Sequence, residues 1–360
     1  MNMPRDIFNF SAGPALIPDS VIEKIHLGLD DFHRGMSIVE VSHRSQAFKE
    51  YAYYSELSLR NLLNINDEFS ILFLQGGATH QFALIPMNFS RNGVLDYLVT
   101  GAWSKKASEY ARKVANINIV SDSSSNNFTN IADSKSWNIS DNSDYFFYCA
   151  NETVHGLEIH NPIESESPVI CDMSSTIASR PIDIQNYDLI FAGAQKNLGI
   201  AGLTIVIVKN RLLSNSDNEL LPMFDYSAHA EEASMLNTSP VFSWYVSGLV
   251  FDWIAEQGGV EAMGKLNKKK STLLYDYIDQ SSFYSNPVSK SYRSWMNIPF
   301  ILARKELEDK FNQSAEDVGL FNLKGHRTVG GMRASVYNAM PIEGIKKLIT
   351  FMDEFAKLHE

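Results

Sequence analysis

Residues 169–197 read VICDMSSTIASRPIDIQNYDLIFAGAQKN, and they contain two short apolar runs, Val169–Cys171 and Leu189–Ala192. An acid, Asp172, follows the first run directly, and Lys196 follows the second after a few small or polar residues. Apolar runs of this length, bounded by polar and turn-forming residues, are typical of buried strands. Ligands of an open α/β sheet bind beyond the carboxyl ends of its strands, so both side chains are candidates for a functional site.

Similar apolar runs recur on both sides of this stretch, and amphipathic segments separate them. The expected strands are Phe69–Leu74, Val94–Val99, Tyr145–Cys149, Val169–Cys171, Leu189–Ala192 and Leu203–Val208. The expected helices of this part are Ser20–His33, a segment that begins after Gly76-Gly77 and ends at Leu84, and Trp103–Val114. Strands that alternate with helices predict an α/β fold whose central sheet is mostly parallel and is flanked by helices.

The last third of the chain has a different pattern, in which long helices are followed by mixed strands and helices. The expected helices are Val241–Gln257, Val260–Ile278, Lys305–Glu316 and Ile342–Lys357, and the expected strands are Met296–Leu302 and Gly331–Tyr337. We therefore predict a large domain over residues 15–257 and a smaller α+β domain over residues 258–360, with the N-terminal segment 1–14 packed on the smaller one. Segment 121–142 is rich in serine, asparagine and aspartate, which predicts an exposed loop.

Composition limits the class of protein. Apolar residues make up 44% of the 360 residues, enough for a sizeable core, and the formal net charge of −11 disfavours nucleic acid and anionic membranes as partners. No stretch approaches the ~20 apolar residues of a membrane helix, and Arg5, Asp6 and Pro14 interrupt any N-terminal signal sequence. Cys149 and Cys171 lie in apolar runs, as buried thiols of a reducing compartment do. We expect a cytoplasmic protein.

A glycine turn follows the first expected strand of the sheet, where residues 74–81 read LQGGATHQ. The N–H groups at the start of a helix favour a phosphate, and Gly76 and Gly77 allow its close approach. A plain strand-to-helix turn explains the same residues equally well. The absence of Gly-Lys-Ser/Thr excludes a P-loop, and the absence of Gly-x-Gly-x-x-Gly disfavours a dinucleotide-dependent dehydrogenase.

Asp172 and Lys196 each have an ordinary explanation and a chemical one. Asp172 suits the N-cap of a helix, and most lysines are solvated loop residues. Alternatively, Asp172 is a carboxylate that pairs with a pyridinium nitrogen, and Lys196 is a Schiff-base lysine whose pKa its surroundings lower. An acid and a lysine at successive strand ends form a pattern that pyridoxal-phosphate (PLP) chemistry explains well.

Basic side chains occur at three further places that suit an anionic substrate. His43-Arg44 follows a β-like run, Ser37–Val41; His326-Arg327 lies in an expected turn; and Arg333 follows Gly330-Gly331. Arginine binds carboxylates and phosphates through two parallel hydrogen bonds. Each site alone reads as a solvated surface charge, but together, in an acidic chain, they predict an anion-binding site.

A metal is not expected, because the histidines at positions 43, 80 and 326 lack the short ligand spacing of a metal site. Trp103 follows Gly101-Ala102 and suits either stacking on a ring or ordinary core packing.

The chain resembles the phosphoserine aminotransferase family of the class-V aminotransferases, which have the fold of the fold-type I PLP-dependent transferases. The resemblance extends from Phe8 to the C-terminal helix. It is most specific in EVSHR (40–44), SSTIASRP (174–181), AGAQKN (192–197), KGHR (324–327), GGMRAS (330–335) and YNAMP (337–341).

This resemblance implies a role for each candidate residue. Lys196 would bind PLP covalently, Asp172 would pair with the ring nitrogen, Trp103 would stack on the ring, and Thr153 would bind its phenolic oxygen. The residues implied to bind the cofactor phosphate are Ala78, Thr79 and Gln195, with Asn237 and Thr238 from the second subunit of a homodimer. The residues implied to bind substrate are Arg44 and Arg333 for acid groups, and His43, His326 and Arg327 for the phosphate or the distal carboxylate of glutamate.

This sequence departs from the family pattern at two places. Some members have serine at the position of Ala12, and some bacterial members have Gly-Arg-Gly where this chain has Ala78-Thr79-His80. A hydroxyl contact is therefore lost at the first position, and a positive charge is missing at the second.

The implied reaction is reversible amino transfer from L-glutamate to 3-phosphohydroxypyruvate, which gives O-phospho-L-serine and 2-oxoglutarate in serine biosynthesis. The sequence leaves open whether the 4-phosphohydroxy-threonine step of pyridoxine biosynthesis is also served. The alternatives are an alanine–glyoxylate aminotransferase, a cysteine desulfurase, and a non-catalytic protein that binds PLP or a small anion. Two His-Arg pairs favour a doubly anionic substrate, and cysteines at strand positions disfavour a desulfurase.

Overall fold

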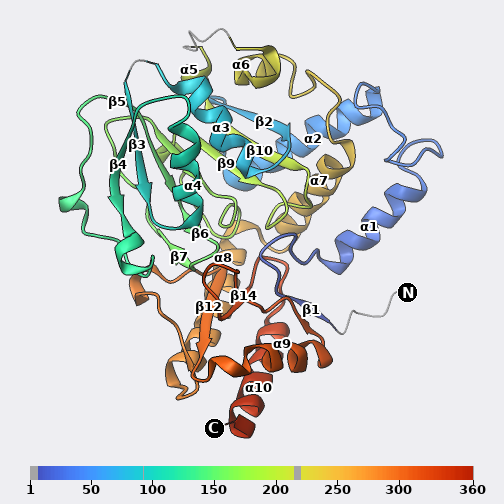
Figure 1. Cartoon of the computed structure of the whole chain (residues 1–360). Helices are drawn as coiled ribbons and strands as arrows, with labels where there is room; N and C mark the ends of the chain where they lie inside the picture. The colour runs from blue at the N-terminus through green and yellow to red at the C-terminus, as the bar shows by residue number, and fades with distance from the viewer. Residues whose placement is uncertain (1–6, 92, 215–219, 360) are drawn as a thin grey trace.

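The computed structural model describes residues 7–91, 93–214 and 220–359. Its centre is a seven-stranded sheet in the order β2-β10-β9-β8-β5-β3-β4 (Figure 1). The strands are β2 (Phe69–Gln75), β3 (Val94–Val99), β4 (Ile117–Asp122), β5 (Ser143–Cys149), β8 (Val169–Asp172), β9 (Leu189–Gly193) and β10 (Leu203–Lys209). Only β10 runs antiparallel to its neighbours in this sheet. The predicted α/β class with a mostly parallel sheet is therefore confirmed.

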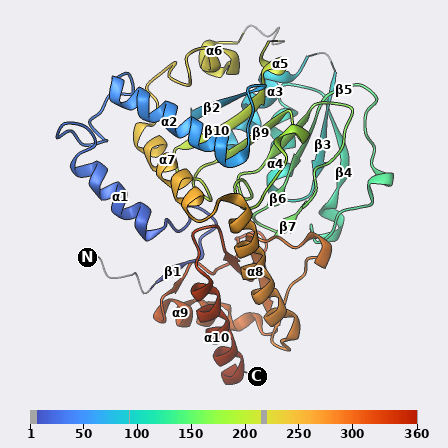
Figure 2. The same cartoon turned by 180° about the vertical axis from the view of Figure 1, so that it is seen from behind.

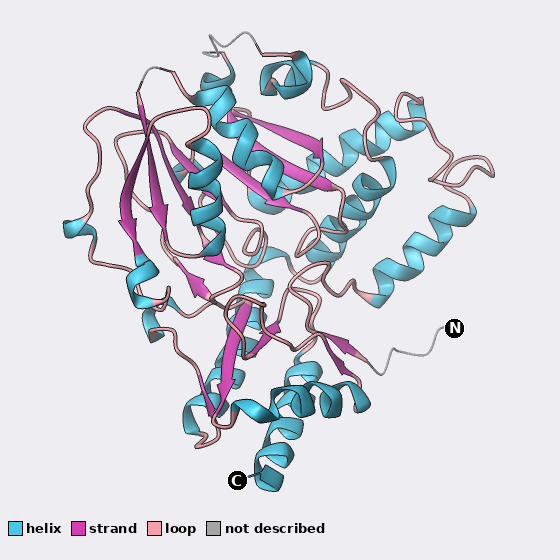
Figure 3. Cartoon of the chain, in the orientation of Figure 1, coloured by secondary structure: helices cyan, strands magenta, loops and turns pink. Residues whose placement is uncertain are grey.

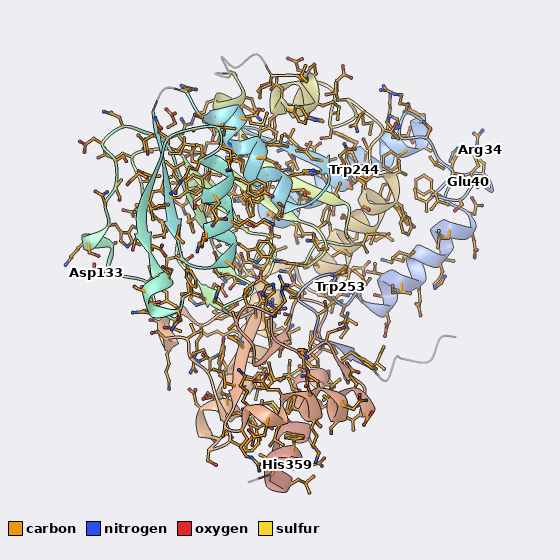
Figure 4. All side chains as sticks on the ribbon, viewed as in Figure 1. Arg34, Glu40, Asp133, Trp244, Trp253 and His359 are labelled. Carbon is orange, nitrogen blue, oxygen red and sulfur yellow. The ribbon has the colours of Figure 1, made fainter. Side chains whose placement is uncertain are left out.

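Helices cover both faces of this sheet, as Figures 1 and 2 show from opposite sides. One face carries α3 (Ala78–Phe89) and α4 (Ala102–Ala111), and the other carries α2 (Gln46–Leu63) and α7 (Val241–Glu256). Side chains alternate along each strand, so that Phe73 faces α7 and Leu74 faces α3. The ring of Trp244 stacks on Phe73 at 4.3 Å between centroids, and Figure 4 labels Trp244 inside this layer.

The C-terminal part forms a second hydrophobic core below the large sheet (Figure 3). Its elements are β11 (Tyr284–Ser285), β12 (Asn297–Leu302), β14 (Met332–Ser335), α9 (Glu308–Asp317) and α10 (Ile342–His359). Helix α8 (Gly259–Gln280) contributes Met263 to the large core and Leu274 to this second core. Strand β1 (Phe8–Asn9) pairs parallel with β13 (Leu320–Phe321), so the start of the described chain packs on this part. The domain boundary at residue 257 stays a prediction.

Short elements complete the chain. They are α1 (Asp19–Asp30), α5 (Asn210–Leu213), α6 (Tyr226–Glu231), β6 (Asn151–Glu152), β7 (Leu157–Glu158) and the 3-10 turns η1 (Ser123–Asn126), η2 (Ser134–Ser136), η3 (Ile184–Asn186), η4 (Pro222–Phe224), η5 (Lys290–Tyr292) and η6 (Lys305–Leu307). Among the described residues, none of the helices combines the length and the apolar character that a membrane crossing requires.

One local prediction is wrong, and a second holds for most of its segment. The β-like run Ser37–Val41 forms turns, because Glu40 N–H donates to the carbonyl of Ser37 at 2.9 Å and closes the backbone on itself. Its apolar side chains Ile38 and Val41 are nevertheless buried in the large core. Segment 121–142 is not entirely loop, since its first two residues end β4 and two 3-10 turns follow. Asp96 on β3 accepts a hydrogen bond from Ser140 Oγ at 2.8 Å and ties the segment down.

Candidate active site

Lys196 lies in the loop that follows β9, at the carboxyl edge of the parallel strands. Its Nζ donates a hydrogen bond to Thr153 Oγ1 at 2.7 Å. Burial lowers the pKa of Lys196 to about 8; the Asp172 carboxylate opposes this shift and the Arg333 guanidinium adds to it. With this pKa a larger fraction of the amine is free base near neutral pH than for an ordinary lysine, and a nucleophile or a proton acceptor must be in that form.

Asp172 ends β8, the strand beside β9, and only 7% of it is exposed. Oδ1 accepts the backbone N–H of Ser174 at 2.8 Å, so the capping role considered from the sequence is present. Oδ2 lies 4.0 Å from the sulfur of Cys149, a long and weak contact. Burial raises the pKa of Asp172, and the nearby Lys196 and the Ser174 hydrogen bonds lower it. The carboxylate therefore keeps one oxygen for a cationic or N–H partner.

The glycine turn predicted to bind phosphate leads from β2 into α3. Gly76 has φ +102°, a conformation that favours glycine. Helix α3 begins at Ala78 after Gly77, and no side chain caps its first turn. Its N-terminal N–H groups, with the hydroxyl of Thr79 beside them, form a site that suits a phosphate.

Asn237 lies beside this turn, because its Nδ2 donates to Gln75 Oε1 of the same chain at 2.7 Å. Thr238, the next residue, is exposed. Whether the two serve a second subunit stays a prediction.

The N-terminal segment covers the lysine loop. Ala15 N–H donates to the carbonyl of Gln195 at 2.9 Å. A Cβ added to Gly13 would lie 3.4 Å from Gln195 Cγ and 3.5 Å from Lys196 Cγ. The carbonyl of Ala12 accepts a hydrogen bond from Tyr337 at 2.9 Å. The hydroxyl missing at Ala12 thus leaves its backbone contact intact.

Trp103 lies in the first turn of α4, and Thr153 follows β6. The indole Nε1 of Trp103 is buried and has no hydrogen-bond partner in the described structure. Thr153 is buried, and its carbonyl accepts Arg333 Nη1 at 3.3 Å. Thr153 therefore connects the lysine loop with the arginine on β14.

Arg333 is half-buried on β14, and its Nε is buried without a partner among the described residues. Burial lowers its pKa, as it does for a cation withdrawn from water. A guanidinium with unused donors fits a carboxylate that binds through two hydrogen bonds.

His326 and Arg327 lie in an exposed turn near Arg333. The ring Nδ1 of His326 pairs with Thr328 Oγ1 at 2.8 Å. Burial, with Arg333 and Arg327, lowers the pKa of His326, so its neighbours are positive. A cleft of about 690 Å³ separates this turn from α4, and His155 and Thr328 are among its lining residues.

His43 and Arg44 are not brought together with this group in one chain. They precede α2, where Ser45 is the N-cap. His43 is buried with Nε2 unpaired, and Arg44 is exposed. Within the described part of the chain, no hydrogen bond or ion pair joins either residue to Lys196 or Asp172. Their role toward substrate stays a prediction.

Sequence reasoning missed Glu152, which is buried between Thr153 and Asn151. The only signal in the sequence was an acid directly before the candidate Thr153. Asn197, next to Lys196, was also missed; its Oδ1 accepts Asn338 N–H at 3.1 Å and links the lysine loop to the C-terminal part.

These residues fit PLP. The buried Asp172 keeps an oxygen free, Lys196 has a lowered pKa, and the start of α3 is uncapped. Trp103, whose buried Nε1 has no partner in the described structure, packs against the same hydrophobic cluster as Ala78 at the start of α3. In the described ranges, no group of three His, Cys, Asp or Glu side chains is placed to hold a metal ion.

Comparisons with known proteins agree with this geometry. The family model described as "Aminotransferase class-V" matches residues 7–348. The phosphoserine aminotransferase of Pseudomonas entomophila is 47% identical over 360 residues, which cover 99% of this chain and 100% of the relative. The phosphoserine aminotransferase of Acinetobacter baumannii strain ACICU is 47% identical over 354 residues, which cover 97% of this chain and 98% of the relative.

Solved structures give the same result. Phosphoserine aminotransferase from Bacillus circulans subsp. alkalophilus superposes with a TM-score of 0.96 at 40% identity, over 98% of this chain and 99% of that one. The PLP-bound phosphoserine aminotransferase from Trichomonas vaginalis has a TM-score of 0.93 at 36% identity, over 96% of this chain and 99% of that one. An alanine–glyoxylate aminotransferase from Nostoc sp. is 15% identical with a TM-score of 0.76, a likeness of fold alone.

Proposed function

The chain belongs to the class-V aminotransferase family, and we infer on that premise that it transfers the amino group of L-glutamate to 3-phosphohydroxypyruvate, giving O-phospho-L-serine and 2-oxoglutarate. The reaction belongs to serine biosynthesis. Relatives that are 46–47% identical across the whole chain support this substrate pair, since each is a phosphoserine aminotransferase.

One observation supports the chemistry most strongly: the amine of Lys196 and the carboxylate of Asp172 lie at the ends of adjacent parallel strands, β9 and β8. The amine is also held by Thr153 at 2.7 Å. A lysine of ordinary pKa would be protonated at neutral pH and would neither attack a carbonyl nor accept a proton.

We propose PLP as the cofactor. Lys196 would hold it covalently, Asp172 would face its ring nitrogen, Thr153 its phenolic oxygen and Trp103 its ring. Ala78, Thr79 and Gln195 would bind its phosphate. When bound, PLP supplies an electron sink that lowers the free energy of the carbanion left when an amino acid loses its α-proton.

The residues of the chain then have distinct tasks. Lys196 Nζ would accept the α-proton of the amino acid in the first half of the reaction, and would donate a proton to the α-carbon of the new amino acid in the second half. Asp172 would keep the ring nitrogen of the cofactor protonated, because a buried carboxylate favours a positive partner. The segment Gly13–Ala15 covers the loop and excludes water from one side of Lys196.

Both substrates carry a carboxylate and a distal anionic group, so one set of cations can bind each in turn, as a ping-pong reaction requires. Arg333 is proposed to bind the carboxylate with its unused donors. His326 and Arg327 are proposed to bind the phosphate or distal carboxylate, with His43 and Arg44 as further contacts. The 4-phosphohydroxy-threonine step of pyridoxine biosynthesis would suit the same set of cations.

We propose further that the protein is a cytoplasmic homodimer whose active sites are shared through Asn237 and Thr238. The free, buried thiols of Cys149 and Cys171 suit a reducing compartment. Mixing Lys196→Ala with an Asn237→Ala/Thr238→Ala double variant tests the sharing. Hybrid dimers would contain one intact site, so up to roughly a quarter of wild-type activity should return with random exchange. If subunits exchange and no activity returns, the sharing is wrong.

The experiment that tests the reaction itself is a visible absorption spectrum of the purified protein, recorded before and after each substrate is added. The bound cofactor should colour it yellow, glutamate should bleach that band, and 3-phosphohydroxypyruvate should restore it. A non-catalytic PLP-binding protein would keep its colour with glutamate, and that result would contradict the proposal.

A further inference from the structure

Glu152 is fully buried. In the described structure, the donors to its carboxylate all lie in the first turn of α4. Oε2 accepts the backbone N–H of Trp103 at 2.9 Å. Oε1 accepts the N–H of Ser104 at 2.8 Å and its hydroxyl at 2.6 Å. The N-cap of α4 is Gly101, which has no side chain to offer. The carboxylate of Glu152, a residue of β6, therefore caps helix α4, and the positive end of the helix dipole favours the negative charge of this carboxylate.

The sequence around α4 leaves room for this contact. A Cβ added to Gly101 would overlap the carboxyl group of Glu152, although the extended backbone there would tolerate any residue. The hydroxyl of Ser104 in turn accepts the N–H groups of Thr100 at 2.8 Å and of Gly101 at 3.1 Å. Glu152 and Ser104 together thus accept the N–H groups of Thr100, Gly101, Trp103 and Ser104 at the start of α4.

The two residues that Glu152 joins are both proposed to contact the cofactor ring. Trp103 is bound through its N–H, and Thr153 is the next residue in the chain after Glu152. Thr153 also receives the hydrogen bond from Lys196. The carboxylate of Glu152 therefore holds the backbone of Trp103, from which the indole extends, at a set distance from the lysine and the threonine.

We propose that Glu152 is a positioning residue that sets the width of the slot for the cofactor ring between Trp103 and the Lys196–Thr153 pair. This inference rests on the proposed function, and Glu152 itself touches neither substrate nor the reacting atoms. Burial raises the pKa of Glu152, whereas the hydrogen bonds from Ser104 and Trp103 lower it. These donors to both oxygens suit the ionised form.

Glu152→Gln tests the proposal, since it keeps the size of the side chain but sets an NH₂ group against backbone donors. We expect the affinity of the apoprotein for PLP to fall at least about tenfold, the effect of leaving a buried donor unpaired. The affinity for inorganic phosphate, measured by competition at the α3 turn, should change less than about twofold. Glu109→Gln, on the exposed side of α4, is the matched control and should change neither affinity.

Two further variants keep the test decisive if Glu152→Gln does not fold. Gly101→Ala displaces the carboxylate without removing its charge, and Ser104→Ala removes one of its donors. Both should weaken PLP binding and spare phosphate binding. Equal losses for PLP and phosphate, or no loss in any of the three variants, would overturn the positioning role. Failure of the wild-type protein to bind PLP at Lys196 would instead contradict the proposed function.

Discussion

Lys196 Nζ lies 2.7 Å from Thr153 Oγ1, although 43 residues separate them in the chain. The contact joins the loop after β9 to the segment after β5, two strands that lie on either side of β8 in the sheet. It aims the amine toward the carboxyl edge of the strands, where Asp172 also lies. Chemistry at this edge therefore depends on strand order, which brings distant parts of the sequence together.

The lowered pKa of Lys196 should be measurable in the apoprotein. Because burial lowers it to about 8, labelling by an amine-selective reagent should rise to half its maximum near pH 8. An ordinary lysine would require about pH 10.4. Peptide mapping of the labelled protein measures this, and Lys196→Ala, which should also lose turnover, identifies the peptide. A half-point near that of exposed lysines would show that the site does not activate the amine.

Asp172→Asn separates the two roles of that side chain. The amide oxygen can still accept the Ser174 N–H, so the free energy of unfolding should change by less than about 1 kcal/mol. The charge proposed to face the cofactor nitrogen is lost, so kcat should fall at least about a hundredfold. Urea unfolding and steady-state kinetics measure the two effects. An equally active variant would leave Asp172 as a helix cap only.

Arg327→Ala tests selectivity for the phosphorylated substrate. Loss of charge-assisted hydrogen bonds should lower kcat/KM for 3-phosphohydroxypyruvate by about 1–3 kcal/mol of transition-state free energy. Unphosphorylated hydroxypyruvate should lose much less, since it has no phosphate to bind. Competition kinetics with both keto acids gives the ratio. If both substrates suffer equally, Arg327 does not recognise phosphate.

Lys270 on α8 predicts a pH dependence of stability. It is fully buried, and its Nζ lies 3.1, 2.7 and 2.9 Å from the carbonyl oxygens of Val336, Tyr337 and Met340; the charged amine can donate to all three and the neutral amine to two. Burial lowers its pKa to about 7. Between pH 7 and about 10.4 the unfolded chain holds a proton that the folded chain has released, so this group makes stability rise with pH by up to about 1.4 kcal/mol per unit.

Lys270→Met should remove that increment. Urea unfolding of both proteins at pH 7 and pH 9 gives the change in the free energy of unfolding between the two pH values. The change in the wild-type protein minus the change in the variant is the contribution of Lys270. All other groups titrate alike in the two proteins and cancel. An unchanged pH dependence in the variant would show that Lys270 titrates as an exposed lysine does.

Strong local patterns made much of the fold predictable from the sequence. The strands that carry the site are short, apolar and buried on both faces, so that β8 and β9 could be identified together with the acid and lysine at their ends. Helix α2 was not identified, although its buried face has helical spacing at Phe48, Ala52 and Leu59. Serines, tyrosines and charged residues lie between these apolar positions and make the helical spacing hard to identify in the sequence.

The rest of the site depends on contacts that local patterns do not contain. The acid at position 152 meets Ser104, 48 residues earlier, only because β5 and β3 pair in the sheet. Likewise, the run Ser37–Val41 alternates like a strand, but it pairs with no strand of the described residues, and its own turn hydrogen bond forms instead.

The most direct test of the account is transfer of ¹⁵N from labelled L-glutamate to 3-phosphohydroxypyruvate, followed by mass spectrometry. The account predicts label in O-phospho-L-serine, an equal amount of 2-oxoglutarate, and no transfer by Lys196→Ala. Glyoxylate, offered at the same concentration, should accept the label far more slowly because it has no distal anion for Arg327 and His326. A protein with bound PLP that transfers no label, or that prefers glyoxylate, would contradict the account.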